Sequence, residues 1–455
     1  MADLNNIKAV YLIGIGGIGM SALARYFKRQ GKLVNGYDKT ETDLTRQLVQ
    51  EGIGVQYEDS VETIPKKVEL VIYTPAIPKD QPALQYYRDH GYEVLKRSDV
   101  LGLITAGSLN VCVAGTHGKT TISTLIAHIL RDSGFGCNAF LGGISVNYNT
   151  NFWTSETNLC VVEADEYDRS FLKLHPDIAV ISSMDADHLD VYGTGAAVEE
   201  AFIAFSSKIK TGGALICKKG LRIPDPERDI LEQTYSLTDR QADIHAENIR
   251  IKEGSYLFDV GGRGGTLKHV KLNIGGRHNI ENALAAIGVC RRLELTDEQI
   301  VLAVDRFQGV KRRFEYHARG GKAVYIDDYA HHPQELRALI RSAKELYPER
   351  KCVLIFQPHL YSRTRDFASA FAESLDMADE VILLAIYPAR ELPIEGVSSK
   401  VILEMMRNMK KQILGKEEVL DWVRSVPQKE KLLLITAGAG DIDSLVDPIE
   451  KILMS

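Results

Sequence analysis

The sequence lacks the features that mark secreted, membrane-spanning and nucleic-acid-binding proteins. Its 6 cysteines form no Cys-x-x-Cys pair, and four of them lie in apolar, strand-like runs, where a reduced cysteine behaves as a small apolar side chain. No apolar stretch reaches the roughly 18 residues that a transmembrane helix needs, and no basic leader precedes the first strand-like run. Lysine and arginine form no tracts, and the net charge is -6. We therefore expect a cytoplasmic protein without disulfides that neither inserts into a membrane nor binds nucleic acid.

Short-period repeats and low-complexity tracts are also missing, and 455 residues are enough for roughly three domains of about 150 residues each. Strand-like and helix-like patterns alternate along the chain, which predicts an α/β protein. We expect a Rossmann-like domain at 1–107, a central P-loop ATPase domain at 108–312 and a Rossmann-like C-terminal domain at 313–455. The central domain should hold a mostly parallel sheet and a small antiparallel sheet at 243–274.

These patterns predict individual elements. Strands are expected at 8–13, 32–37, 68–73, 111–114, 159–162, 178–182, 323–326, 352–356, 380–385 and 432–435, and helices at 20–30, 279–293 and 296–307, after Pro333 and after Arg365.

A first glycine-rich turn follows the first predicted strand and precedes a helix. It carries Gly14, Gly16, Gly17 and Gly19, and the acidic residue Asp38 ends the second strand. This pattern fits NAD, but a glycine turn at a helix N-terminus holds any diphosphate, including that of a UDP-sugar, for the same physical reason.

A second glycine-rich turn joins a valine-rich apolar run to a helical pattern. Free backbone N–H groups and the helix dipole attract a phosphate there, the Lys119 ammonium spans phosphate oxygens, and the Thr120 hydroxyl suits Mg²⁺. Val113 occupies the place of the first glycine of longer phosphate loops, and the shorter G-T-x-G-K-T form is the one used by ligases that add amino acids to carboxylates. The candidate ATP-binding residues of this turn are Gly115, Thr116, His117, Gly118, Lys119, Thr120 and Thr121.

Acidic and imidazole side chains follow the next two predicted strands. Glu163 and Glu166 come after one strand, and Asp187 and His188 after the other. Ligands of an open α/β sheet bind beyond these strand ends, and so many anions around one point require cations. Mg²⁺ is bound by few carboxylates together with substrate phosphates. We therefore predict that Thr120 and Glu163 hold one Mg²⁺ and that His188 holds a second, although each acidic cluster alone is also typical of a solvated loop.

Two predicted strand ends of the third domain carry histidine and arginine. His331 and His332 beside an aspartate are compatible with a metal site, but Pro333 directly after them is typical of a helix N-terminus. Arg363 and Arg365 suit a carboxylate ligand or, equally, a solvated helix start.

The chain resembles the Mur ligase family over essentially its whole length. The resemblance implies a first domain that binds the UDP of a sugar nucleotide, a central ATPase domain, and a third domain that closes over both with the amino acid. The matching motifs lie at 14–19, 115–120, 163–166, 187–188, 276–283, 312–314, 327–333 and 387–391.

The resemblance also implies roles for individual residues. Lys119 would bind ATP phosphates, and Arg313 and Asp328 would secure the nucleotide. The implied catalytic residues are therefore Lys119, Glu163, His188, Arg313 and Asp328. His278, Asn279 and Asn282 would line the adenine side, Tyr329, His331, His359 and Arg363 would lie near the amino acid, and Gly14, Gly16, Gly17, Gly19 and Asp38 would bind the UDP-sugar.

Within the family the motifs match the branch that adds L-alanine to UDP-N-acetylmuramate in peptidoglycan precursor synthesis. The implied reaction uses ATP and two Mg²⁺ ions, passes through an acyl phosphate of the lactyl carboxylate, and is carried out by a monomer or homodimer. Leu360 stands where some members carry an arginine for the alanine carboxylate, which implies a larger share of that work for Arg363.

Four other functions are compatible with parts of the sequence. The nearest is a recycling ligase that joins a tripeptide to the same UDP-sugar, although the 358–365 segment favours a single alanine. A folylpolyglutamate synthase shares the phosphate loop but not the glycine-rich first domain. An NAD-dependent dehydrogenase would leave Lys119 without a role, and a non-catalytic nucleotide-gated binding module would leave Glu163 and His188 without one.

Overall fold

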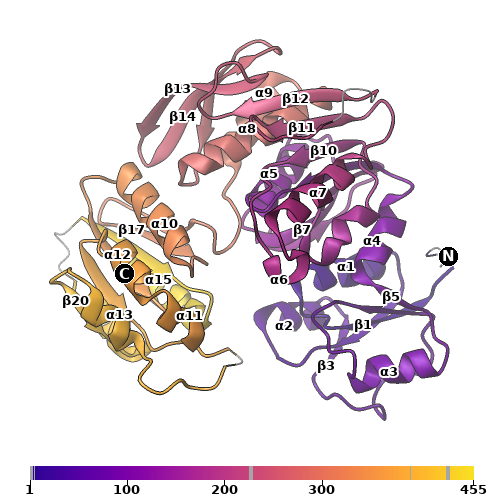
Figure 1. The fold of residues 1–455 in the computed structure, drawn as a ribbon, viewed down its shortest axis with the longest axis horizontal. Coiled ribbons are helices and arrows are strands. Elements are labelled where there is room, and N and C mark those ends of the chain that lie inside the picture. Colours follow the sequence, from indigo (N-terminus) through magenta and orange to yellow (C-terminus); the bar gives the residue numbers. More distant parts are fainter. Residues whose placement is uncertain (1–3, 5, 225–228, 390, 427–430, 455) are drawn as a thin grey trace. The chain divides into compact units, whose positions relative to one another are not determined.

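The computed structural model describes residues 4, 6–224, 229–389, 391–426 and 431–454 of the chain, so Arg390 of the 387–391 motif lies outside the described residues. The chain forms two compact units. One consists of residues 1–247, 259–270 and 281–305, and the other of residues 248–258, 271–280 and 306–455. Helices and strands alternate through both units, as the sequence predicts (Figure 1).

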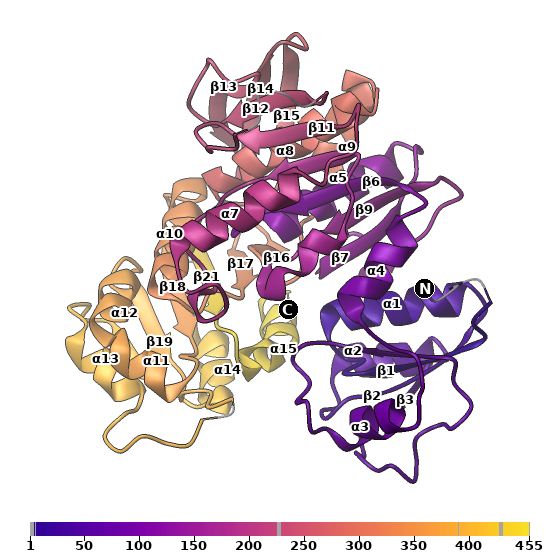
Figure 2. The same ribbon diagram turned by 45° about the vertical axis from the view of Figure 1, so that its right-hand side comes forward.

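The N-terminal sheet has five parallel strands in the order β3-β2-β1-β4-β5, which is the arrangement of a Rossmann-like sheet. Its central strand, β1, is buried along its whole length, as expected of a strand covered on both faces. The strands are β1 (Ala9–Ile13), β2 (Leu33–Tyr37), β3 (Gly54–Gln56), β4 (Leu70–Tyr73) and β5 (Val94–Lys96), and the helices are α1 (Ile18–Arg29), α2 (Asp43–Gln50), α3 (Pro82–Asp89) and α4 (Arg97–Thr105) (Figure 2).

The central sheet places the predicted strand ends side by side. Strand β6 (Leu109–Ala114) leads into the phosphate loop, and its two neighbours are β9 (Leu159–Glu163) and β10 (Ile178–Ile181), both parallel to it. The carboxyl ends of these three strands therefore meet at one edge of the sheet. The elements around them are α5 (Lys119–Asp132), β7 (Asn138–Ser145), β8 (Thr150–Trp153), η1 (Tyr167–Lys173), α6 (Leu189–Tyr192) and α7 (Gly195–Ser206).

The strands predicted at 243–274 extend this same sheet instead of forming a separate one. The sheet has ten strands, in the order β15-β14-β13-β12-β11-β10-β6-β9-β7-β8. Only two residues, Glu253 and Gly254, connect β13 to β14, and both have positive φ, which is the geometry of a tight antiparallel hairpin. The elements of this part are β11 (Ala214–Lys218), β12 (Leu231–Ser236), β13 (Ile244–Lys252), β14 (Ser255–Gly262), β15 (Leu267–Leu272), α8 (Arg277–Arg292) and α9 (Asp297–Arg306).

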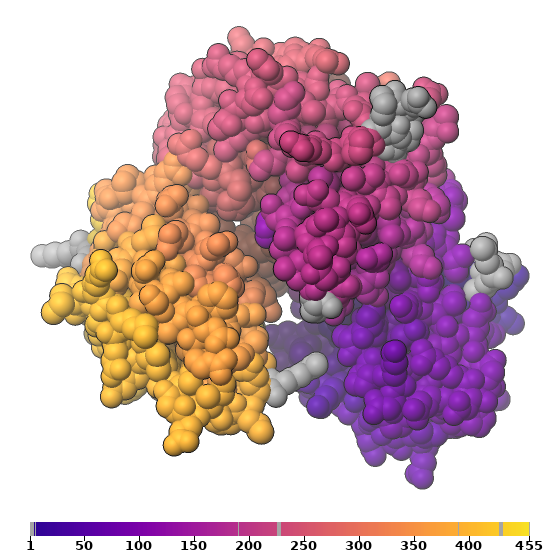
Figure 3. Space-filling view, in the orientation of Figure 1, coloured from indigo at the N-terminus to yellow at the C-terminus, as the bar shows by residue number. Residues whose placement is uncertain are grey.

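The N-terminal and central sheets pack together within the first unit. Helix α1 lies against β7 and β8. In Figure 3 the indigo and purple atoms of this unit form one continuous surface. Arg25 of α1 is 7% exposed; it donates a 2.5 Å hydrogen bond to Asn151 of β8 and contacts Glu51 at 2.8 Å. The Arg25–Asn151 hydrogen bond is buried and joins α1 to β8, so it fixes the N-terminal sheet against the central sheet.

The C-terminal sheet has six strands in the order β16-β17-β21-β18-β19-β20, all parallel except β16, which runs antiparallel to β17. Helix α10 begins at Pro333, as predicted. The helix expected after Arg365 is α12, which begins at Ala368, and the shorter helix α11 begins before it at Tyr361. The elements are β16 (Glu315–Arg319), β17 (Ala323–Asp328), β18 (Lys351–Phe356), β19 (Glu380–Leu383), β20 (Lys411–Ile413), β21 (Leu432–Ala437), α10 (Pro333–Leu346), α11 (Tyr361–Asp366), α12 (Ala368–Leu375), α13 (Ser399–Met405), α14 (Lys416–Ser425), η2 (Asp441–Leu445) and α15 (Val446–Met454).

All six cysteines are buried free thiols. Burial raises the pKa of several of these thiols, for example that of Cys217 to about 12. Among the helices that the structure describes, none combines the length and the apolarity needed to cross a bilayer.

Candidate active site

The phosphate loop connects β6 to α5 and depends on two glycines. Gly115 and Gly118 have φ of 135° and 84°, which L side chains rarely adopt. A Cβ built on Gly115 would lie 2.1 Å from Oγ of Ser182, and one on Gly118 would lie 2.6 Å from Oδ1 of Asn282. Any larger residue would therefore strain the loop backbone and clash with Ser182 at position 115 or with Asn282 at position 118.

Side chains of the neighbouring β10 strand end support the middle of this loop. The Thr116 and Ser183 hydroxyl oxygens lie 2.8 Å apart, and the His117 N–H donates to Ser183 Oγ at 2.8 Å. Nε2 of His117 lies 3.6 Å from an Asp185 carboxylate oxygen. The loop is therefore fixed by hydrogen bonds from outside it.

Lys119 opens α5 and is anchored by a buried carboxylate. Its Nζ lies 2.8 Å from both carboxylate oxygens of Glu166 and donates to the Gly115 carbonyl at 2.7 Å. Glu166 is 0% exposed, and burial raises its pKa while the Lys119 ammonium lowers it. The sequence motif contained Glu166, but nothing in the spacing identified it as the partner of Lys119.

Thr120 and Glu163 come together as predicted. The Thr120 hydroxyl donates to Oε1 of Glu163 at 2.9 Å, and Oε2 of Glu163 accepts from the Gly142 N–H at 2.9 Å. A hydroxyl and a carboxylate side by side at a phosphate loop are hard oxygen donors of the kind that Mg²⁺ prefers. Groups of three or more His, Cys, Asp and Glu that could hold a metal are absent from the described part of the chain, so substrate oxygens would have to complete such a site.

His188 belongs to the same network. Its Nε2 lies 3.7 Å from Oε1 of Glu166, and its backbone N–H donates to Asp187 at 2.7 Å. The ring of Tyr167 meets the His188 ring edge-on, with centroids 5.2 Å apart. His188 has φ of 51°, a conformation that costs roughly 1–3 kcal/mol outside glycine, so these contacts hold it in a strained position.

The first glycine turn lies at the carboxyl ends of β1 and β2. The N–H groups of Gly14 and Ile15 donate to the Tyr37 carbonyl, and the Gly16 N–H donates to Oδ2 of Asp38 at 2.8 Å. Gly17 is the N-cap of α1 and Gly19 lies in its first turn. The five residues predicted to bind a sugar nucleotide are thus gathered around one helix N-terminus.

The residues expected on the adenine side lie at the start of α8. Asn282 packs against the phosphate loop at Gly118. His278 and Asn279 precede it by about one turn on the same helix, and the Asn279 amide donates to the Gly275 carbonyl at 2.6 Å.

Asp328 shapes the linker that carries Arg313. Its carboxylate accepts from the backbone N–H groups of Phe314 at 2.7 Å and Ala330 at 2.8 Å. The Arg313 N–H donates to the Val310 carbonyl, and Arg312, with φ of 59°, donates to Asp327. Burial raises the pKa of the Asp328 carboxyl to about 6. Asp328 thus fixes the backbone of the linker in addition to the nucleotide role that the family resemblance implies.

A pH dependence of stability follows from this raised pKa. An unfolded aspartate titrates near pH 3.9, so between about pH 4 and 6 the folded protein binds a proton that the unfolded chain has released. The free energy of unfolding contributed by Asp328 therefore falls as the pH rises through this window, by at most about 1.4 kcal/mol per pH unit. Urea denaturation in a Trp153→Phe background, where Trp422 reports on the second unit, should show that Asp328→Asn removes this slope. The exposed Asp447→Asn should retain it, and an unchanged slope in Asp328→Asn would refute the assignment.

The residues expected near the amino acid form an aromatic and cationic cluster in the second unit. The His331 ring lies 5.3 Å from that of Tyr329 and 6.0 Å from that of His359. His359 stacks on Tyr387 at 5.8 Å, and burial and then Arg363 lower the pKa of its imidazole. Nδ1 of His359 and Nη1 of Arg363 are buried without a hydrogen-bond partner. Two orphaned nitrogens, one of them cationic, fit the carboxylate of a small ligand.

The structure adds Tyr387 to this cluster and shows that the backbone of Leu360 is held in an unusual conformation. Tyr387 reaches His359 through an isolated parallel bridge, which no local sequence pattern reveals. Leu360 has φ of 71°, and its N–H donates to the Tyr387 carbonyl.

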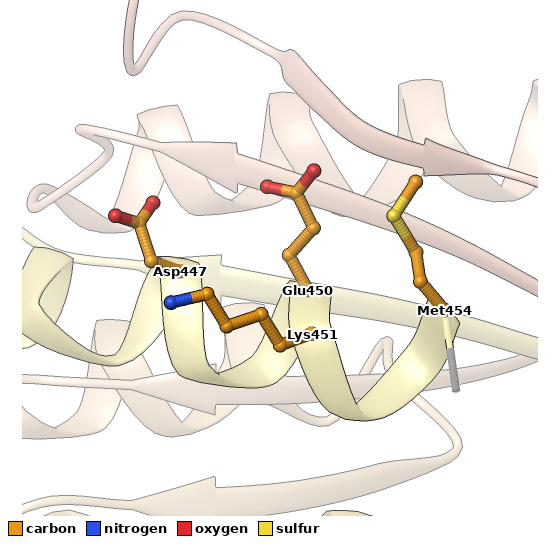
Figure 4. A pocket seen from close by; sticks show the side chains of 4 residues that line it. All are labelled: Asp447, Glu450, Lys451 and Met454. Carbon is orange, nitrogen blue, oxygen red and sulfur yellow. The ribbon is translucent and has the colours of Figure 1, made fainter.

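A hollow of about 430 Å³ on α15 lies apart from these residues. Asp447, Glu450 and Met454 project from the same side of the helix, with Lys451 beside them (Figure 4). None of these four residues was predicted to bind substrate. Two carboxylates and one ammonium group do not form a phosphate site, so we assign no ligand to it.

Comparison with known families accounts for almost the whole chain. Residues 9–108 match the Mur ligase family, catalytic domain; residues 113–290 match the Mur ligase middle domain; and residues 312–442 match the Mur ligase, glutamate ligase domain. The boundaries between these matches fall close to the start of the phosphate loop and to the Arg313 linker.

Individual proteins align over their full length. The chain is 47% identical over 455 residues to the UDP-N-acetylmuramate–L-alanine ligase of Flavobacterium johnsoniae, with 99% of each chain covered. It is 49% identical over 458 residues to the ligase of the same name from Parabacteroides distasonis, with 99% of this chain and 98% of that one covered.

Solved structures share the fold. The UDP-N-acetylmuramate-alanine ligase MurC from Thermotoga maritima superposes with a TM-score of 0.83 at 27% identity, with 99% of both chains covered. A murein peptide ligase from Psychrobacter arcticus superposes with a TM-score of 0.69 at 21% identity and 98% coverage of each chain, which shows a common fold.

Proposed function

The chain belongs to the Mur ligase family, and we propose that it joins L-alanine to the lactyl carboxylate of UDP-N-acetylmuramate while ATP is converted to ADP and phosphate. One observation carries this proposal beyond the likeness to its relatives. The Lys119–Glu166 and Thr120–Glu163 pairs and His188 meet at neighbouring strand ends. That edge offers an ammonium group, oxygen donors and an imidazole around the phosphate loop.

The chemistry consists of two displacements. An oxygen of the lactyl carboxylate attacks the γ-phosphorus of ATP, the bond to the β,γ-bridging oxygen breaks, and ADP leaves with that electron pair. The amine of L-alanine, having lost a proton, then attacks the acyl carbon, and phosphate leaves. Carboxylate and triphosphate repel each other, so the Lys119 ammonium and, by family resemblance, Arg313 stabilise the charge that builds up in the first step.

The oxygen donors Thr120 and Glu163 fit one Mg²⁺, which when bound would neutralise phosphate charge, and we propose that His188 contributes to a second ion. Glu166 keeps Lys119 at the phosphate loop, and Tyr167 restrains the His188 ring. These side chains are therefore held in place before substrates arrive.

We further propose the division of labour that the sequence predicted. Residues 1–107 would bind the UDP-sugar, 108–312 ATP, and 313–455 the amino acid, the last through Tyr329, His331, His359 and Arg363. The orphaned nitrogens of His359 and Arg363 support a carboxylate ligand there. We infer a cytoplasmic enzyme, since its thiols are unpaired. The family resemblance supports a monomer or homodimer.

Phosphate release tests the proposal. The protein would be incubated with ATP, Mg²⁺ and UDP-N-acetylmuramate, and each amino acid of a panel added in turn, together with the tripeptide used by recycling ligases. We expect stoichiometric phosphate and an alanyl product with L-alanine and little release with the tripeptide. Preference for the tripeptide would support the recycling ligase, and no release with any acceptor would refute a ligase function.

A further inference from the structure

Arg97, the first residue of α4, lies directly against the first glycine turn. A Cβ built on Gly19 would be 2.5 Å from Nη1 of Arg97 and 3.1 Å from its Cδ and Cζ. The guanidinium group therefore covers the start of α1, where the glycine turn leaves helix N–H groups free for an anion. No glycine-rich motif or spacing rule in the sequence connects residue 97 with residue 19.

The same guanidinium also reaches the central sheet. Nη2 of Arg97 lies 3.6 Å from Oδ2 of Asp165, two residues after Glu163. Two ion pairs flank this contact: Lys96, the last residue of β5, with Asp168 at 3.9 Å, and Asp99 of α4 with Lys173 at 3.3 Å. Arg97 thus contacts both the glycine turn, at Gly19, and the segment that directly follows Glu163, at Asp165.

Asp165 lies close to the Arg97 guanidinium group, but the N–H donors of that group remain available for a ligand. Its contact with Asp165 is longer than a hydrogen bond, the Arg97 side chain is 21% exposed, and it donates no hydrogen bond to another residue that the structure describes. An arginine has five N–H donors in a planar fork that matches phosphate oxygens. Since Asp165 is 41% exposed, a more strongly charged anion at the turn can compete with it for Arg97.

We propose that Arg97 binds the diphosphate of the sugar nucleotide and that Asp165 holds its guanidinium in place until the diphosphate arrives. This assignment rests on the proposed function, because it takes the ligand of the glycine turn to be a UDP-sugar. It adds a cationic side chain to a site whose other members are the glycines of the turn and the Asp38 carboxylate. It also connects occupancy of that site to the segment that follows Glu163.

Binding measurements test the assignment without turnover. Isothermal titration of Arg97→Ala with UDP and with UDP-N-acetylmuramate should show about 10- to 100-fold weaker binding of both, because a charge-assisted phosphate contact is lost. A non-hydrolysable ATP analogue should bind within about twofold of the wild type, since Arg97 does not contact the phosphate loop. Arg97→Lys, which keeps the charge but loses the fork, should be intermediate.

Two variants separate ligand binding from a merely structural ion pair. Asp165→Asn breaks the same pair but leaves Arg97 in place, so it should bind UDP at least as tightly as the wild type. Lys96→Ala removes an equal charge one residue away and should leave UDP binding within about twofold. If Asp165→Asn weakens UDP binding as much as Arg97→Ala does, Arg97 is a structural residue and the assignment is wrong.

The remaining outcomes are equally decisive. Weaker binding of UDP-N-acetylmuramate with unchanged binding of UDP would move the contact from the diphosphate to the sugar and overturn the proposal. Unchanged binding of both would overturn it as well. Failure of the wild type itself to bind UDP and UDP-N-acetylmuramate would instead contradict the proposed function.

Discussion

Replacement of Lys119 by alanine is expected to reduce turnover by roughly 10³-fold, because removal of one group that stabilises transition-state charge costs about 10²–10³-fold and Lys119 carries a full positive charge. Its Nζ is held next to the phosphate loop by the Gly115 carbonyl and by Glu166. Phosphate release with saturating L-alanine and UDP-N-acetylmuramate measures the effect. Near-normal turnover would contradict the assignment of Lys119.

Stability must be separated from catalysis in this experiment. Without Lys119 the buried Glu166 loses its cation, and removal of one partner from a buried ion pair costs about 3–5 kcal/mol. The double variant Lys119→Met/Glu166→Gln removes both charges, so we expect it to recover much of the stability but none of the activity. Lys210 provides the matched control, since it pairs with Asp177 at 2.8 Å at the opposite edge of the same sheet. Lys210→Met should keep turnover within about twofold.

Replacement of Glu163 by glutamine should lower turnover by roughly 10²-fold and raise the Mg²⁺ concentration needed for half-maximal activity. Glutamine keeps the size of the side chain and one acceptor oxygen, but it loses the negative charge beside the Thr120 hydroxyl. Titration of Mg²⁺ at fixed ATP gives both parameters. A variant whose Mg²⁺ requirement equals that of the wild type would show that Glu163 does not bind the metal.

Two further variants sharpen this test. Thr120→Val keeps the shape of the side chain but removes the hydroxyl, so its Mg²⁺ requirement should rise in the same direction. Glu156→Gln removes an exposed carboxylate from the stretch between β8 and β9, and its Mg²⁺ titration should match that of the wild type.

The sequence predicted the parts of this site that depend on strand ends. Buried runs such as 111–114 and 159–162 are apolar because both faces of the sheet are covered, so their ends are easy to locate. Parallel strands bring the residues at their carboxyl ends together at one edge of the sheet. The amino-acid sequence alone therefore predicts that Thr120 and Glu163 lie close together. The glycines of both turns are identifiable for a similar reason, since their residue type reflects a backbone constraint.

Contacts between distant segments were not predictable in this way. Arg97 lies near Gly19 because α1 and α4 belong to one packed layer, and Tyr387 meets His359 only through tertiary folding. Glu166 was visible in a motif, but its burial under Lys119 depends on the path of η1, where Asp168 and Arg169 adopt positive φ. Period-two patterning at 243–274 indicated strands, yet it could not show that they extend the central sheet, because alternation does not specify the neighbouring strand.

The transfer of phosphate to a carboxylate is the central claim, and an isotope label tests it most directly. UDP-N-acetylmuramate labelled with ¹⁸O in both lactyl carboxylate oxygens would be converted with ATP and L-alanine, and the released phosphate analysed by mass spectrometry. We predict that each phosphate carries one ¹⁸O atom, because the carboxylate oxygen that attacks the γ-phosphorus leaves with it. Phosphate without label would contradict an acyl phosphate and the role assigned to the Lys119 and Glu163 edge of the sheet.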